Sequence, residues 1–264
     1  MSEKENPIVI RPIVERFVYA KPLKGDFAKR VYDETRARVT RDFKDAPAFN
    51  GYWEFNEQTG EINGSSNLWA LMTDLVLRQE GLWIPDFIEA KALERIGLLT
   101  NGVYRDNGNT VYNAQDPNHE IAEGLVAEAE RAGLTLPILL PFRALDIRKA
   151  ENRFGVNLIF AKEPKGIISG QKALDALQKE FDYRADSGAH RLCRDYDGLW
   201  GAGWDGLGDS YADGQVDFVC GEATQKSLEA LALQDLNDQA EQEIRRIQDR
   251  IRTAREAYEK ALKV

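Results

Sequence analysis

The residues best suited to chemistry lie between positions 187 and 222. Glycines, aspartates and aromatic residues alternate there, and seven acidic residues stand against two basic ones, Arg191 and Arg194. Such carboxylates can hold a hard cation through oxygen ligands. Two of them beside an exposed indole can also bind a sugar and carry out acid–base hydrolysis. The catalytic or cation-binding candidates are Asp205, Asp209, Asp213 and Asp217, and the ligand-binding candidates are Trp200, Trp204 and Tyr211.

The same composition is also typical of surface hairpins, because Asp and Gly accumulate in turns. In that interpretation Trp200 and Trp204 anchor the hairpins to the core. The run Asp195-Tyr196-Asp197-Gly198 begins like a calcium loop, but it lacks a third oxygen ligand two positions on and a later glutamate. We therefore favour hairpins and loops here and keep the carboxylate enzyme, or the carbohydrate- or cation-binding module, as the alternative.

Three residues of this stretch, His190, Cys193 and Cys220, have side chains that bind zinc. A structural zinc site has four ligands, usually in two closely spaced pairs, and only the His190-x-x-Cys193 pair is present. Asp195 or Asp217 would have to complete it. The alternative is that both cysteines are buried in reduced form as small apolar side chains. We expect no cofactor, and zinc or calcium is the metal these residues would suit.

A second pattern lies near the C-terminal end. Seven residues recur at alternating spacings of four and three, which is the a/d pattern of a coiled coil over three heptads. They are Ala240, Ile244, Ile247, Ile251, Ala254, Tyr258 and Ala261. The interaction candidates among them are Ile244, Ile247, Ile251 and Tyr258. So narrow a seam fits one partner helix, so we expect either self-association, or a protein partner, or packing back onto the chain's own body.

The elements that position these residues mix helices with antiparallel hairpins, without β-α-β alternation, which predicts the α+β class. We expect one globular body over residues 1–221, with a soft boundary near 135, and a long amphipathic helix over 222–264. Periodicity, capping residues and turn signals give the further elements. The expected helices are 25–43, 66–80, 86–96, 116–132 and 171–181; the expected strands are 7–20, a hairpin in 52–62, a hairpin in 103–112 around Asp106-Asn107-Gly108, and an antiparallel pair in 137–148 and 156–162.

The order helix, helix, hairpin over 66–112 resembles a winged-helix domain. The would-be recognition helix carries more acidic than basic residues, which argues against nucleic acid as a partner. A winged-helix-like binder of nucleic acid or protein is thus the third interpretation. The helix expected at 25–43 has a basic face, Lys29, Arg30, Arg36, Arg38 and Arg41, which is either laced with ion pairs or open to an acidic partner.

Composition narrows the function further. The net charge of −9 disfavours a protein that coats nucleic acid. The sequence contains no run of 18 apolar residues, so we expect no membrane span. The polar first residues show no secretory signal, so we expect a cytoplasmic protein. Two histidines, with no nucleophile elbow or phosphate loop, disfavour an enzyme. We therefore expect an intracellular binding or assembly protein, of the kind that phages or accessory genes encode.

Overall fold

The structure is a computed structural model, and the residues it describes fall into two compact units. The units are Met1–Gly221, called the body below, and Glu222–Val264. The described residues are 18–95, 97, 99, 102, 104–113, 121–183, 188–195, 197–207, 210–216, 218–222, 244, 246–253 and 255. Each unit is described by itself.

The body contains helices and short strands in mixed order. Its helices are α1 (Gly25–Asp42), α2 (Asn67–Leu77), α3 (Phe87–Arg95), α4 (Glu123–Arg131) and α5 (Gln171–Glu180), with single turns of 3-10 helix at Pro47–Phe49, Arg78–Glu80 and Phe142–Ala144. Its strands are β1 (Val18–Pro22), β2 (Glu54–Asn56), β3 (Glu61–Ser66), β4 (Leu82–Trp83), β5 (Tyr104–Tyr112), β6 (Ile138–Pro141), β7 (Leu145–Lys149), β8 (Val156–Phe160), β9 (Ile168–Ser169), β10 (Asp182–Tyr183), β11 (Ala189–Arg194), β12 (Trp200–Gly206), β13 (Ser210–Gln215) and β14 (Phe218–Glu222). The expected α+β class is confirmed.

Nine of the strands form the main sheet, in the order β10-β12-β11-β5-β13-β3-β2, with β6 and β9 joined to it through β5. The pairs β10–β12 and β13–β5 are parallel and the other pairs of this sheet are antiparallel. Two smaller sheets, β1-β14-β4 and β7-β8, complete the body. Strand β5 is the centre of the arrangement, because it pairs with β11 on one edge and with β13 and β6 on the other.

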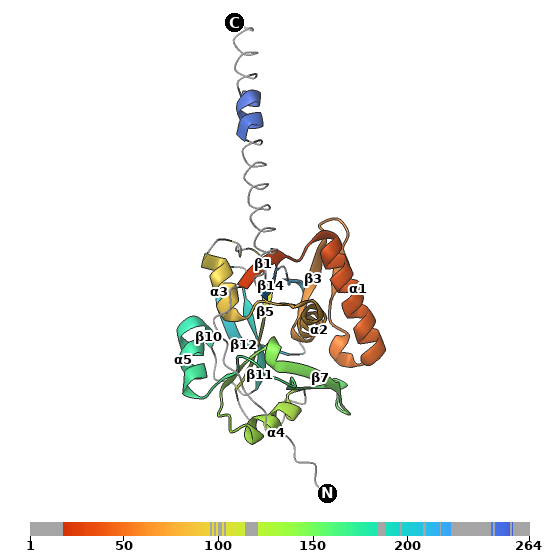
Figure 1. The fold of residues 1–264 in the computed structure, drawn as a ribbon, viewed down its shortest axis with the longest axis vertical. Coiled ribbons are helices and arrows are strands. Elements are labelled where there is room, and N and C mark those ends of the chain that lie inside the picture. The colour runs from red at the N-terminus through yellow and green to blue at the C-terminus, as the bar shows by residue number, and fades with distance from the viewer. Residues whose placement is uncertain are drawn as a thin grey trace. The chain divides into compact units, whose positions relative to one another are not determined.

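Helices cover both faces of the main sheet. Tyr112 and Leu140 belong to one apolar cluster, whereas their chain neighbours Val111 and Leu139 belong to a second. Neighbouring residues of a strand point to opposite faces, so the two clusters lie on opposite faces of the sheet. Helices α1, α2 and α4 supply the first cluster and α3 and α5 the second. Figure 1 shows α1 and α2 on one side of the central strands and α3 and α5 on the other.

Several expected elements are confirmed with small shifts of their ends. Helix α1 buries Val31 and Val39 as its spacing predicts, and α2 stops before Gly81, whose φ of 73° is left-handed. The hairpin β2–β3 and the pair β7–β8 are antiparallel as expected. Helix α4 is shorter than the expected 116–132, and residues 114–120 lie outside the described ones. The N-terminal part of the strand expected at 7–20 also lies outside them, and β1 is its described end.

The hairpin expected at 103–112 is wrong. The stretch is one strand, β5, in which all nine residues are buried. Asp106-Asn107-Gly108 makes a bulge instead of a turn. Thr110 pairs with Arg191 and Asp106 pairs with Cys193, so β5 has more residues between these two pairs than β11 has. Gly108 fits there because a Cβ on it would lie 2.6 Å from the carbonyl oxygen of Ile84. The Asn-Gly pair therefore serves close backbone packing.

The long helix expected over 222–264 is not supported. Within this second unit the structure describes helical residues only at 244, 246–253 and 255. Residues 223–243 and 256–264 lie outside the described ones, and with them Tyr258.

Candidate functional site

The acidic candidates of 195–217 are spread over two strands and their connections. Asp205 lies in β12 and Asp213 in β13, and their side chains lie outside the described part of the chain, as do Asp209 and Asp217 as a whole. Asp195 and Asp197 shape the turn between β11 and β12. The N–H of Asp195 donates to the Leu199 carbonyl (2.8 Å), and the Asp197 carboxylate accepts from the Leu199 N–H (3.1 Å). These two aspartates thus have the role of turn residues.

Of the aromatic candidates, the structure describes the side chains of Trp200 and Tyr211. Trp200 is buried, and its indole N–H donates to the Glu94 carboxylate (3.3 Å). Its ring packs edge-on against Phe181, at a centroid distance of 6.3 Å. Tyr211 is exposed and lies against Tyr104, at a centroid distance of 5.7 Å. The side chain of Trp204 is not described. Trp200 therefore anchors β12 to the core, since its polar edge already has a partner.

The zinc candidates are not gathered. His190 and Cys193 lie on β11 of the main sheet, whereas Cys220 lies on β14 of the three-stranded sheet. Both cysteines are buried, and the thiol of Cys193 faces the Gly201 carbonyl (3.7 Å). Burial raises the pKa of the Cys220 thiol, so it stays protonated. In the described part of the chain no three His, Cys, Asp or Glu side chains stand together as a metal site.

The structure instead gathers buried charge on β5 and β11. The Arg191 guanidinium, fully buried, lies 3.5 Å from the Asp106 carboxylate and stacks over the rings of Tyr104 and Tyr211. The Arg194 guanidinium donates to the Glu94 carboxylate (2.9 Å). Burial raises the pKa of the Tyr104 hydroxyl and keeps it neutral. The bulge turns this stretch of β5, so that consecutive polar side chains are buried in one place.

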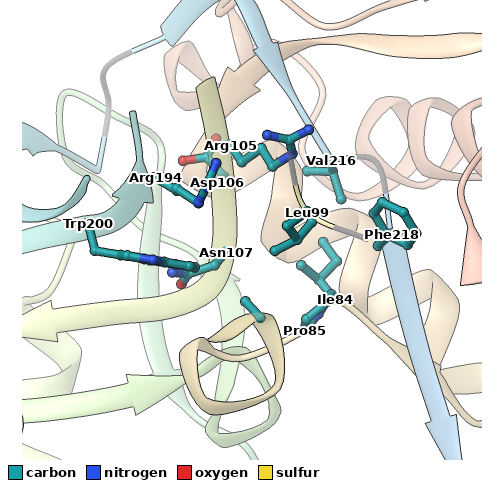
Figure 2. A pocket seen from close by; sticks show the side chains of 11 residues that line it. Ile84, Pro85, Leu99, Arg105, Asp106, Asn107, Arg194, Trp200, Val216 and Phe218 are labelled. Carbon is teal, nitrogen blue, oxygen red and sulfur yellow. The ribbon is translucent and has the colours of Figure 1, made fainter. Parts of the chain in front are cut away.

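A pocket opens beside this bulge (Figure 2). Its polar lining comes from β5 and β11, through Arg105, Asp106, Asn107 and Arg194. The rest of its lining is apolar and consists of Ile84, Pro85, Ala90, Leu99, Trp200, Val216 and Phe218. The cavity measures about 20 Å³, which is room for one or two small polar groups. The sequence pattern did not predict this pocket, because it indicated a hairpin turn at Asp106-Asn107-Gly108.

A second buried polar cluster lies at the start of α3. Arg143 forms ion pairs with Asp86 and with Glu89, the latter at 3.0 Å, and its guanidinium lies over the Trp83 ring. The Trp83 indole N–H donates to the Glu89 carboxylate (3.0 Å). Burial, followed by the charge of Asp86, raises the pKa of Glu89 to about 7. Both carboxylates therefore already have partners inside the body.

The nucleic-acid and acidic-partner interpretations find little support in the body. The expected wing is the central strand β5, and α2, the first helix of the motif, is buried over its whole length. On α1, Lys29 and Arg30 pair with Asp33 and Glu34, and Arg30 also pairs with Glu80. Arg38 and Arg41 pair with Asp42, and Arg36 donates to the Trp53 carbonyl. Its basic face is therefore laced with ion pairs.

The C-terminal interaction candidates are exposed where the structure describes them. Ile244, Ile247 and Ile251 are 54%, 47% and 63% exposed. Their spacing of three and four residues places them on one side of the helix. The helix side chains around them are exposed too, among them Arg246, Asp249 and Arg250. Three isoleucines thus form an apolar stripe between charged side chains.

Comparison with known proteins adds nothing to these sites: no family model, no curated protein and no solved structure matches the chain. Within the described ranges, none of the helices has the length and apolar character needed to cross a lipid bilayer.

Proposed function

We propose that this protein is an assembly protein, in which the terminal segment of one copy pairs with the same segment of a second copy. The exposure of Ile244, Ile247 and Ile251 on one helix side carries the proposal. Large aliphatic side chains at a and d spacing gain most when a second helix covers them. A two-fold pairing needs only one self-complementary surface, which a single chain encodes.

The charge of the segment favours a second copy in antiparallel orientation. Residues 235–243 contain four acidic residues and no basic one, whereas 245–255 contain five arginines and one aspartate. Antiparallel pairing sets the acidic half of each copy against the basic half of the other. The register that places Ile244 opposite Ile247 of the second copy also brings Glu243 near Arg250 of that copy. Parallel pairing would instead place Arg250 near Arg255 of the second copy.

Light scattering on the full chain, across a dilution series, tests the proposal. We expect the mass at high concentration to reach twice the 29.8 kDa of one chain and to fall on dilution. Ile247→Asp introduces a charge into the seam and should leave a single chain. Thr253→Asp introduces the same charge on the opposite side of the helix and should preserve the pair. A single chain at every concentration, or pairing that survives Ile247→Asp, overturns the proposal.

A further inference from the structure

The bulge of β5 interrupts one edge of the main sheet. On that edge, pairing with β13 reaches Arg105, and pairing with β6 begins at Asn109. Between these positions the Gly108 N–H donates to the Pro85 carbonyl (2.8 Å), which belongs to the connection before α3. The pocket of Figure 2 lies at this interruption, with Asp106 and Asn107 in its lining. Bulges are frequent beside binding sites because they redirect side chains out of the regular ladder.

Asn107 is the polar group that this packing leaves incomplete. Its side chain is 4% exposed and lines the pocket. Its Oδ1 accepts from the Asn109 N–H (3.0 Å), which fixes the amide, while its Nδ2 has no hydrogen-bond partner in the described part of the chain. A buried amide donor without a partner is costly, and native proteins rarely keep one. The orientation of the amide therefore indicates an acceptor seated in the pocket.

The surroundings specify the kind of acceptor. Arg105 and Arg194, which are 7% and 2% exposed, line the same pocket together with Asp106, and the Arg194 guanidinium also donates to the Glu94 carboxylate. In the view of Figure 2, Arg105 extends from β5 toward Val216, and Asn107 lies on the side of Trp200. Guanidinium and amide N–H groups together suit the planar oxygens of a carboxylate. Leu99 and Phe218 add apolar walls that suit a short alkyl body.

We propose that this pocket binds a small aliphatic carboxylate, one oxygen of which accepts from the Asn107 amide. The cavity of about 20 Å³ limits the enclosed part to the carboxylate and its nearest carbons. This site is independent of the pairing of terminal segments, because all of its lining residues belong to the body.

Calorimetric titration and thermal melting of the full chain test the site, with sodium formate, acetate, propionate and butyrate as probes. Sodium chloride at equal ionic strength controls for salt, and propionamide controls for shape without charge. We expect at least one carboxylate to bind and to raise the melting temperature, and propionamide to have no effect. If no carboxylate acts beyond sodium chloride, or if propionamide acts as well as propionate, the proposal is wrong.

Asn107→Asp tests the amide directly, because it keeps the acceptor for the Asn109 N–H and replaces the donor by a negatively charged oxygen. We expect roughly ten- to a hundredfold weaker carboxylate binding, the value of a hydrogen bond to a charged group. Asn50→Asp makes the same change at an exposed residue and should leave binding unchanged. Leu99→Ala shortens an apolar wall residue and so enlarges the pocket. It should shift the binding preference among the carboxylates toward butyrate, which a purely structural role of Asn107 would not produce. Equal binding by Asn107→Asp, or an unchanged preference in Leu99→Ala, overturns the assignment.

Discussion

Asp86 and Glu89 cap helix α3 reciprocally. The Asp86 carboxylate accepts from the Glu89 backbone N–H (3.0 Å), and the Glu89 carboxylate accepts from the Asp86 backbone N–H (2.9 Å). This is a capping box with aspartate in the first position. The Asp86 and Glu89 side chains are only 5% and 13% exposed, and Arg143 pairs with both carboxylates. The first turn of α3 is therefore part of a polar cluster in which Glu89 has a raised pKa.

Glu89 makes the stability of the body depend on pH. Burial and the charge of Asp86 raise its pKa from 4.5 to about 7. Between these values the folded chain holds a proton that the unfolded chain has released, so the free energy of unfolding falls as the pH rises. We expect Glu89→Gln to lack this fall and to gain on the wild type by on the order of 2 kcal/mol between pH 4.5 and 8. Urea unfolding at several pH values measures this difference.

Glu151→Gln is the matched control, because Glu151 is exposed in the turn between β7 and β8. Its difference from the wild type should stay constant over the same pH range. A constant difference for Glu89→Gln as well would show that Glu89 has an ordinary pKa in the folded chain.

Removing Arg143 should be costly because two buried carboxylates then lose their shared counter-charge. We expect Arg143→Met to lower the free energy of unfolding by about 3 kcal/mol at pH 8, and by less at pH 5, where Glu89 is protonated. Arg41→Met removes an arginine that is 71% exposed and paired with Asp42, and should have a much smaller effect, because exposed ion pairs contribute little to stability. Equal losses for the two variants in urea unfolding would contradict the prediction.

The local signals in the sequence predicted most helices and two hairpins. Hydrophobic periodicity predicted α1, α2, α3 and α5, and Gly81 indicated where the helix containing α2 ends. Both signals come from residues close together along the chain. The partners of β5 depend on segments far away in sequence, β11 and β13. No local pattern encodes such pairings, so the class was predictable and the order of strands was not.

The pocket shows why the candidate site was missed. Asp106-Asn107-Gly108 is a strong turn signal because Asn and Gly tolerate positive φ. In β5 the same residues serve a bulge, where Gly108 admits the Ile84 and Pro85 backbone and Asn107 turns an amide into the pocket. The seam residues Ile244, Ile247 and Ile251 were recognisable because helical spacing alone defines them.

Gly108 should resist even the smallest substitution. A Cβ there would lie 2.6 Å from the Ile84 carbonyl oxygen and 3.0 Å from that of Pro85, and backbone atoms cannot rotate away. We expect Gly108→Ala to lower the free energy of unfolding by about 2–3 kcal/mol, as overpacking does. Gly81→Ala meets open space and pays only for its left-handed φ of 73°, about 1 kcal/mol. Urea unfolding compares them, and a milder effect at Gly108 would contradict the close approach.

Charge reversal at Glu243 and Arg250 tests the orientation of the paired segments. In antiparallel pairing each residue faces the other one in the second copy, so one substitution alters two symmetric contacts. We expect Arg250→Glu alone to weaken pairing roughly tenfold, and Glu243→Arg with Arg250→Glu to restore it. High salt should shrink both effects, since exposed charges are screened. Light scattering over a dilution series gives the dissociation constants. Tighter pairing in Arg250→Glu alone would indicate parallel segments, because it would relieve the repulsion between Arg250 and Arg255.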